Sequence, residues 1–238
     1  MEHLKLESPL QSAADINRFV AKYGLSYNGS AEALDRLHRI AIMEKLNPNF
    51  VPECSPPNDP STEIIRNKYV ALLYKHAKCF AVSLRDLAEP ARAPPFRVVT
   101  FGEPTFTPPI RLPPTHLDFL RNEIAESKAG NIIQSGTSAW SAGCFVVPKP
   151  RSTKLRLVID YRRLNAQTIR DSYPIPHIWD IIRRIGHYSI YHKLDLKSGF
   201  WQIQVATDSI DKLAFSTPDE LLLWLRCPMG VRNGPPHF

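Results

Sequence analysis

The chain has 238 residues and is 43% hydrophobic, which is enough for one large domain or for one domain with a smaller extension. Its net charge of +7 lies mostly in residues 111–238, where 17 Lys and Arg stand against 11 Asp and Glu. A polyanion such as nucleic acid or a triphosphate suits that half, although a charged run alone more often marks a solvated surface. No apolar run approaches the roughly 18 residues of a membrane span, and no hydrophobic leader follows Met1. We therefore expect no membrane partner, no secretion, and an intracellular, cytoplasmic protein.

The numbers of prolines and cysteines further limit the kind of protein that this sequence can encode. The chain holds 22 prolines against 10 glycines, which predicts extended, proline-punctuated connections instead of a low-complexity tail. The four cysteines, Cys54, Cys79, Cys144 and Cys227, are too widely spaced for a Cys-x-x-Cys pair. A zinc site or a disulfide framework is therefore not expected, and a reducing compartment fits.

The first third of the chain is predicted to be helical. Residues 12–46 contain two amphipathic helices, the first ending at Gly24 and the second beginning after Ser30, a good N-cap. The second helix places Leu34, Leu37 and Ile40 on one face. Residues 47–61 hold five prolines and are predicted to be a linker. A third helix, residues 62–79, is expected to bury a stripe of Ile65, Tyr69, Leu72 and Leu73.

The middle of the chain changes from extended to helical to strand-like. Residues 89–114 are rich in proline and predicted to be extended. Thr115 is predicted to cap a helix that ends near Gly130, with Asp118 completing an acidic capping box. This helix turns Leu117, Leu120 and Ile124 inward. Residues 144–147 and 155–161 are predicted to be two strands of a hairpin around the turn 149–154.

The last third supplies a further helix and three more strands. Pro176 is predicted to open a helix that carries Ile178, Ile181, Ile182 and Ile185. Residues 190–196, 201–205 and 221–226 are predicted to be strands. The sequence therefore predicts an α+β fold, a mixed sheet backed by helices.

Asp195 is the most informative single residue. It lies in KLDLKSGFWQI, residues 193–203, between Leu194 and Leu196 at the predicted end of a strand. An aspartate there can hold a divalent metal beside a reacting phosphate. On spacing alone, Asp195 shares a strand face with Lys193 and Lys197, which favours a surface ion pair instead.

Five motifs, taken in order, resemble the reverse transcriptase of gypsy-like LTR retrotransposons, part of a Gag-Pol polyprotein. They are LVIDYRRLN (157–165), SYPIPHIWDII (172–182), KLDLKSGFWQI (193–203), LAFSTPDE (213–220) and CPMGVRNGPPHF (227–238). The resemblance is continuous from about residue 69. It implies the fingers and part of the palm of a right-hand polymerase, with the thumb absent. Residues 1–60 would be a helical extension and linker, residues 61–114 a lead-in, and residues 115–238 the fingers and partial palm.

The resemblance also implies roles for single residues. Asp195 would be the catalytic aspartate and would bind magnesium together with the carbonyl of Leu196. The residues expected to bind the nucleotide are Lys149, Arg156, Phe200 and Met229. The residues expected to brace the fingers or contact the template are Asp160, Arg162, Asn165, Pro228 and Gly230. The Phe200 ring would collide with a ribose 2′-hydroxyl and so select deoxynucleotides.

Each of these residues also has a plain structural interpretation. Phe200 alone is more often part of a core, and Lys149 and Arg156 alone are more often solvated. Asp160 and Arg162 can simply pair with each other along one strand face.

Departures from the family pattern bear on activity. The family needs two adjacent aspartates in a later hairpin, and this chain has no Asp-Asp pair. Two magnesium ions need bridging anionic ligands, so we expect this chain alone to be inactive. Leu213 and Glu220 replace a threonine and a turn glycine, and Gly234 and Pro236 replace alanines at a helix start. These changes suggest a degenerate or truncated copy.

Three interpretations stay open from the sequence. The first is a fragment of an RNA-directed DNA polymerase, a nucleotidyltransferase that binds RNA/DNA template-primer and dNTP. Its remaining partners would be the rest of the polyprotein: palm hairpin, thumb, ribonuclease H and integrase. The second is a non-catalytic nucleic-acid-binding remnant. The third is a transposon relic without function.

Overall fold

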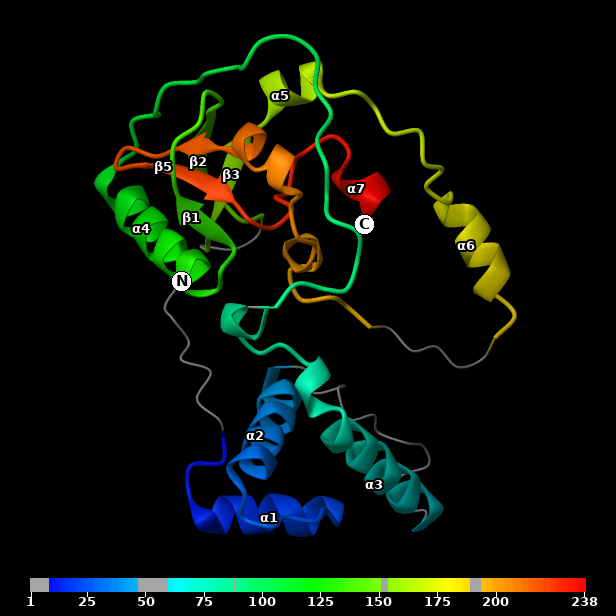
Figure 1. Ribbon diagram of the computed structural model, residues 1–238. Helices are drawn as coiled ribbons and strands as arrows, with labels where there is room; N and C mark the ends of the chain where they lie inside the picture. Colours follow the sequence, from blue (N-terminus) through cyan, green and yellow to red (C-terminus); the bar gives the residue numbers. More distant parts are fainter. Residues whose placement is uncertain (1–8, 47–59, 88, 151–153, 189–193) are drawn as a thin grey trace. The chain divides into compact units, whose positions relative to one another are not determined.

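The computed structural model describes residues 9–46, 60–87, 89–150, 154–188 and 194–238 (Figure 1). The chain divides into two compact units, residues 1–83 and 84–238. Most of the predicted linker, residues 47–61, lies outside the described residues. In the described part of the chain, no helix is long and apolar enough to cross a membrane.

The first unit consists of helices, as predicted. They are α1 (Ala13–Tyr23), α2 (Ala31–Leu46), α3 (Pro60–Lys75) and the 3-10 turn η1 (Ala77–Cys79). Helix α1 ends at Gly24, whose φ of +59° is the left-handed conformation that glycine adopts readily. The Ser30 hydroxyl accepts a hydrogen bond from the backbone N of Ala33 at 3.1 Å, which confirms Ser30 as the cap of α2. Leu37 and Ile40 are fully buried beside Tyr23 and Val70.

The predicted stripe of α3 is partly wrong. Ile65 and Leu72 are 57% and 54% exposed, whereas Val70 is fully buried and Leu73 nearly so. Leu73 lies three residues after Val70, and the buried Ala77 of η1 lies four residues after Leu73, so the three follow the spacing of one helical face. The core of this unit therefore selects a neighbouring face of the helix, which apolar spacing alone did not distinguish.

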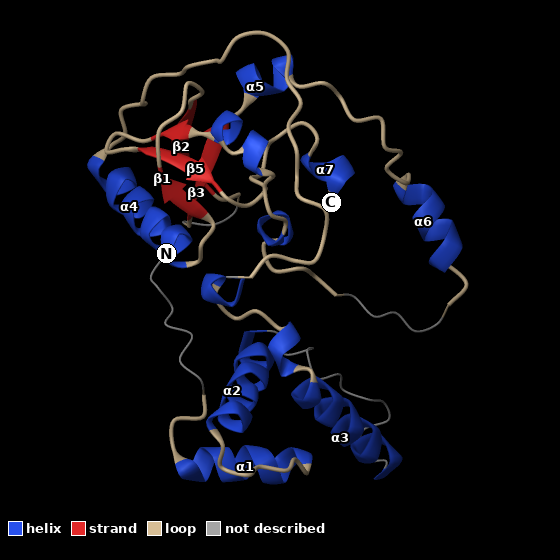
Figure 2. Ribbon diagram, in the orientation of Figure 1, coloured by secondary structure: helices blue, strands red, loops and turns tan. Residues whose placement is uncertain are grey.

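The second unit is built on a five-stranded mixed sheet (Figure 2). Its strands are β1 (Ile133–Ser135), β2 (Ala142–Pro148), β3 (Leu155–Asp160), β4 (Phe215–Ser216) and β5 (Leu221–Trp224). The order is β1-β5-β4-β2-β3, and only the β2–β4 pair is parallel. The predicted α+β class with a mixed sheet and helices is confirmed. The core includes fully buried Leu213, Phe215 and Leu222.

Helix α4 (Pro114–Ala129) packs beside this sheet and is tied to the β4–β5 turn by ion pairs (Figure 1). Arg121 binds both carboxylate oxygens of Asp219, at 2.8 and 3.2 Å. Lys128 binds Glu220 at 2.7 Å. The predicted cap at Thr115 is wrong: the helix begins at Pro114, and Pro113 occupies the cap position without a side-chain hydrogen bond. Proline is favoured at the first helical position because its missing N–H would have no partner there.

The remaining helical elements of the second unit are short. They are α5 (Arg162–Gln167), α6 (Ile178–Ile185), α7 (Gly234–His237) and the 3-10 turns η2 (Leu84–Leu87), η3 (Gly199–Gln202), η4 (Thr207–Ser209) and η5 (Asp211–Leu213). Helix α6 begins after His177, two residues later than predicted, and none of its residues is buried. Its isoleucine stripe therefore faces no core in the described part of the chain.

Two predicted strands are corrected. Of residues 190–196, those before 194 lie outside the described residues, and Leu194–Leu196 is not a strand; Leu194 is 87% exposed. Trp201 and Gln202 belong to η3, and only Gln204 and Val205 form bridges, to Arg226 and Phe96. The alternation of apolar and polar residues at 194–196 favoured a strand, but no partner strand lies beside these three residues in the described part.

The extended segment that precedes α4 runs along the outside of the second unit and is bridged to it at three points. We call residues 91–107 the perimeter segment. It forms isolated β-bridges from Phe96 to Val205, from Thr100 to Thr168 and from Phe106 to Ser141. Figure 1 shows this segment passing around the outside of the sheet. Phe96 is 1% exposed, so the segment contributes to the core as well as to the edges.

Candidate active site

The hairpin of β2 and β3 places two predicted nucleotide ligands on one face. The two strands pair antiparallel, with Val147 opposite Arg156. The pairing continues as the backbone N of Lys149 donates to the carbonyl of Lys154 at 2.7 Å. Because alternate residues of a strand share a face, Lys149 lies on the same face as Val147 and therefore as Arg156. Arg156 is exposed and Lys149 half-buried, so this face offers two cations to solvent.

Asp160 and Arg162 form an ion pair at the end of β3. The Arg162 guanidinium binds the two carboxylate oxygens of Asp160 at 2.8 and 2.7 Å. The Arg162 backbone N also donates to this carboxylate, at 3.1 Å. The side-chain hydrogen bond from Arg162 lowers the pKa of Asp160. The plain interpretation, mutual pairing, is therefore correct for these two residues, although the contact runs around the strand end into α5. The pair fixes the point at which the chain leaves the hairpin.

Asn165 joins two motifs that are far apart in the sequence. Its Nδ2 donates to the carbonyl of Gly230 at 2.8 Å, and its Oδ1 accepts from the backbone N of Arg232 at 2.8 Å. Gly230 has a φ of +90°, a conformation that other residues rarely adopt. Pro228 is buried, whereas Met229 is 58% exposed. One predicted bracing residue therefore holds the turn that contains Pro228, Met229 and Gly230.

Asp195 lies four residues before η3, and Phe200 lies within η3. Asp195 is exposed, and so is Leu196, at 56%. The turn after Asp195 is fixed by Ser198, whose φ of +47° is left-handed, and by a 2.9 Å hydrogen bond from Gln202 Nε2 to the carbonyl of Lys197. Phe200 is half-buried. Its ring centroid lies 5.1 Å from that of Phe238.

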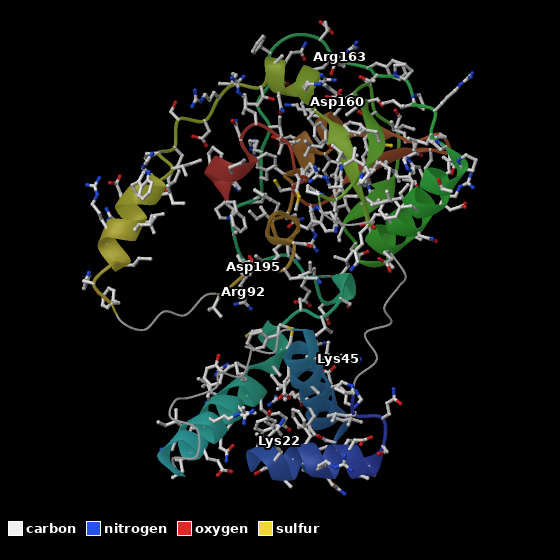
Figure 3. The ribbon with its side chains drawn as sticks, turned by 180° about the vertical axis from the view of Figure 1, so that it is seen from behind. Lys22, Lys45, Arg92, Asp160, Arg163 and Asp195 are labelled. Atoms are coloured by element: carbon white, nitrogen blue, oxygen red, sulfur yellow. The ribbon has the colours of Figure 1, made fainter. Side chains whose placement is uncertain are left out.

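The structure brings some predicted site residues together and leaves others apart. Figure 3 shows Asp160 beside α5 and Asp195 well separated from it. Among the described residues, Asp195 makes no hydrogen bond or ion pair with another predicted site residue. No three His, Cys, Asp or Glu side chains in the described part of the chain gather as metal ligands would. The described residues therefore do not complete a magnesium site around Asp195.

Sequence reasoning missed three residues that hold the site. Arg232 and Asn233 bind the chain after α5, and Phe238 packs against Phe200. Gly199 carried a signal that could have found the last contact, since a Cβ at Gly199 would lie 2.8 Å from the Phe238 ring. The Phe238 ring lies this close because residue 199 has no Cβ.

Comparisons with known proteins agree on one family. Residues 147–238 match the family described as reverse transcriptase (RNA-dependent DNA polymerase). The chain is 36% identical over 143 residues to the Pol polyprotein of transposon 297 from Drosophila melanogaster, which covers 58% of this chain and 14% of that protein. It is 36% identical over 126 residues to the gypsy Pol polyprotein of the same organism, covering 51% and 12%. The chain thus spans only a small part of the curated relatives it matches.

Solved structures share the fold. The protease-reverse transcriptase of prototype foamy virus matches with a TM-score of 0.66 and 18% identity, covering 81% of this chain and 25% of that one. The foamy viral enzyme in complex with an RNA/DNA hybrid matches with a TM-score of 0.63 and 19% identity, over the same shares. Identities this low support the fold alone.

Proposed function

Because residues 147–238 are a reverse transcriptase domain related to the Pol polyproteins of gypsy-, 412- and 297-type LTR retrotransposons, we propose that this chain supplies the fingers and part of the palm of an RNA-directed DNA polymerase. Its role is to bind RNA/DNA template-primer and a deoxynucleotide. The proposed division is a helical extension in residues 1–60, a lead-in in 61–114 and the polymerase part in 115–238. The rest of the polyprotein supplies the palm hairpin, thumb, ribonuclease H and integrase.

One contact carries this proposal. Asn165 and Gly230 come from two separate motifs, and a 2.8 Å hydrogen bond joins them. The brace and the turn proposed to face the nascent base pair therefore form one structural block. The basic face of the β2–β3 hairpin adds a chemical argument. An arginine fork such as that of Arg156 binds phosphate bidentately, while Lys149 acts as a point charge.

The proposed sugar pocket rests on Phe200. Its ring is held by Phe238 on one side and is only half-buried, so one part of it stays accessible. A ring in that place excludes a ribose 2′-hydroxyl and admits a deoxyribose. This selection is part of the proposal and is tested separately from phosphate binding.

Magnesium belongs to the family chemistry, and the residues of this chain provide only part of its site. In the proposal, the carboxylate of Asp195 and the carbonyl of Leu196 are ligands. The adjacent aspartates of the family are not among the 238 residues. We therefore expect the purified chain to bind without polymerising. Magnesium-dependent extension of a DNA primer on an RNA template, above the level of an Asp195→Asn variant, would refute this.

The binding role is tested with the purified chain and a fluorescent RNA/DNA template-primer. Its affinity should fall steeply with salt, because phosphate contacts release counterions. Replacing Lys149 or Arg156 with Gln should each weaken binding about 3- to 10-fold and reduce the salt slope by about one. The matched control is Lys45→Gln, the same charge change on α2 of the first unit, where Figure 3 labels Lys45. Equal losses in all three variants would point to non-specific charge attraction and contradict the proposed site.

A second candidate is non-catalytic nucleic-acid binding, without nucleotide selection. The incomplete carboxylate set around Asp195 in the described part favours it. The discriminating measurement is the effect of the next complementary dNTP on template-primer affinity, with the matching rNTP as control. A gain with dNTP that Phe200→Ala extends to rNTP favours the polymerase fragment. No effect of either nucleotide favours the second candidate.

A further inference from the structure

Two side chains outside the predicted site attach the turn of residues 228–230 to the chain after α5. These are Arg232 and Asn233, which follow the turn after Val231. Their partners lie in residues 165–171, more than 60 positions earlier in the sequence. These long-range hydrogen bonds act together with the bond from Asn165 Nδ2 to the Gly230 carbonyl, and they connect the turn to α5 and the residues after it.

Asn233 uses both ends of its side-chain amide. Its Nδ2 donates to the carbonyl of Ile169 at 2.7 Å, and its Oδ1 accepts from the backbone N of Asp171 at 3.1 Å. Asn233 is 9% exposed, so water cannot readily replace either partner. A buried amide with one donor and one acceptor in use admits few substitutes. Aspartate has the same shape but would place a carboxylate oxygen against the Ile169 carbonyl.

Arg232 connects the same two segments through its backbone and its guanidinium. Its Nη1 donates to the carbonyl of Asn165 at 3.0 Å and to that of Thr168 at 3.3 Å. Its backbone N donates to the Asn165 side chain. The Arg232 side chain reaches from an exposed position, so its removal should not prevent folding.

Of the three residues of the turn, Pro228 is buried and the other two are exposed. Met229 is 58% exposed, and Gly230 adopts a φ of +90°. We propose that Asn233 and Arg232 are positioning residues, which set the placement of Met229 and Gly230 against the nascent base pair. This inference rests on the proposed function for its consequence, but the attachment of the turn is testable without nucleic acid.

The first experiment compares Asn233→Asp with wild type and with Asn122→Asp, the same change at an exposed position of α4. Template-primer affinity at pH 8 should fall about tenfold in Asn233→Asp only, as expected for a buried hydrogen bond replaced by repulsion. Amide hydrogen exchange should show about tenfold less protection across residues 229–232 in that variant, since local opening becomes easier. Unchanged protection there would overturn the inference.

Acidic pH provides a readout that a general loss of stability would not give. A protonated Asp at position 233 regains a donor for the Ile169 carbonyl, and the carbonyl together with burial raises the pKa of that carboxyl. The affinity ratio of wild type to Asn233→Asp should shrink to within about threefold at pH 5. The charged or titratable neighbours are Arg232, Asp171 and His237, whose backbone N donates to Asn233. All three are present in wild type, which serves as the reference at each pH. A ratio that stays constant or widens contradicts the role.

Arg232→Lys is the second variant, and it guards against failed folding of Asn233→Asp. It keeps the charge but loses the paired contacts of the guanidinium, so affinity should fall about threefold with an unchanged salt slope. Unaltered affinity and unaltered protection would overturn the role of Arg232. If wild type shows no salt-dependent binding at all, the proposed function fails. The protection of residues 229–232 in the two variants then decides the positioning role alone.

Discussion

Replacing Tyr161 with Phe removes a buried hydroxyl and its hydrogen bond from the core of the second unit. Tyr161 is 2% exposed, and its hydroxyl donates to the carbonyl of Leu213 at 2.8 Å. The bond links the start of α5 to η5, 52 residues later. A hydrogen bond contributes about 0.5–1.5 kcal/mol net, and leaving a buried carbonyl without this donor adds a penalty. We expect Tyr161→Phe to lower the free energy of unfolding by about 1–2 kcal/mol.

The assay is urea unfolding followed by tryptophan fluorescence. All four tryptophans, Trp140, Trp179, Trp201 and Trp224, lie in residues 84–238, so the signal reports the second unit alone. The urea midpoint should fall while the slope with urea stays constant, because the exposed area on unfolding does not change. Tyr173→Phe is the matched control, since Tyr173 is 64% exposed. If the two variants unfold within about 0.3 kcal/mol of each other, the reasoning on this bond is refuted.

Three further predictions concern the same unit. Burial raises the pKa of Tyr161 above its ordinary value of 10.0. The stabilisation that comes from this raised pKa is complete below pH 10 and is lost as the pH rises above 10. The difference in free energy of unfolding between wild type and Tyr161→Phe, measured by urea titration, should therefore shrink by about 1.4 kcal/mol per pH unit above pH 10. Gly136→Ala should lower the free energy of unfolding by about 1–3 kcal/mol in urea titrations, because a Cβ there would lie 2.3 Å from Leu223. Gly199→Ala should lower it by under about 0.5 kcal/mol, because the exposed Phe238 ring can move. Equal losses in the two variants would contradict this. Leu213→Thr restores the residue usual in the resembling family, yet should destabilise by about 2–4 kcal/mol, because Leu213 is fully buried and the new hydroxyl would enter an apolar core; a more stable variant would show that the core was misjudged.

Local patterns predicted the elements that local forces determine. The spacing of Leu37 and Ile40 gave α2, and the apolar runs around a basic turn gave the β2–β3 hairpin. These elements form largely from neighbouring residues, so their signals lie close together in the sequence. The ion pair of Asp160 and Arg162 was likewise open to prediction, because only one residue separates the two.

Long-range contacts could not be predicted in the same way. The bond between Asn165 and Gly230 spans 65 positions, and no periodicity encodes it. The strand predicted around Asp195 was wrong for a related reason, because strand formation also depends on a partner that is distant in sequence. Leu194 and Leu196 alternate with a charged residue as in a strand, but a strand also needs a partner, and both leucines are exposed. Thr115 is of a residue type that commonly caps helices, but Pro113 occupies the cap position because the helix begins at Pro114.

The perimeter segment has a consequence for how the protein is made. Residues 96, 100 and 106 are synthesised before the residues with which they form bridges. Phe96 can form its bridge only after Val205, 109 positions later, has been added to the chain. Contacts of such separation form slowly, because a long loop must close before they contribute. The second unit therefore cannot complete its fold before residue 205 has been synthesised, and a nascent chain that stalls earlier leaves Phe96 exposed to chaperones and proteases.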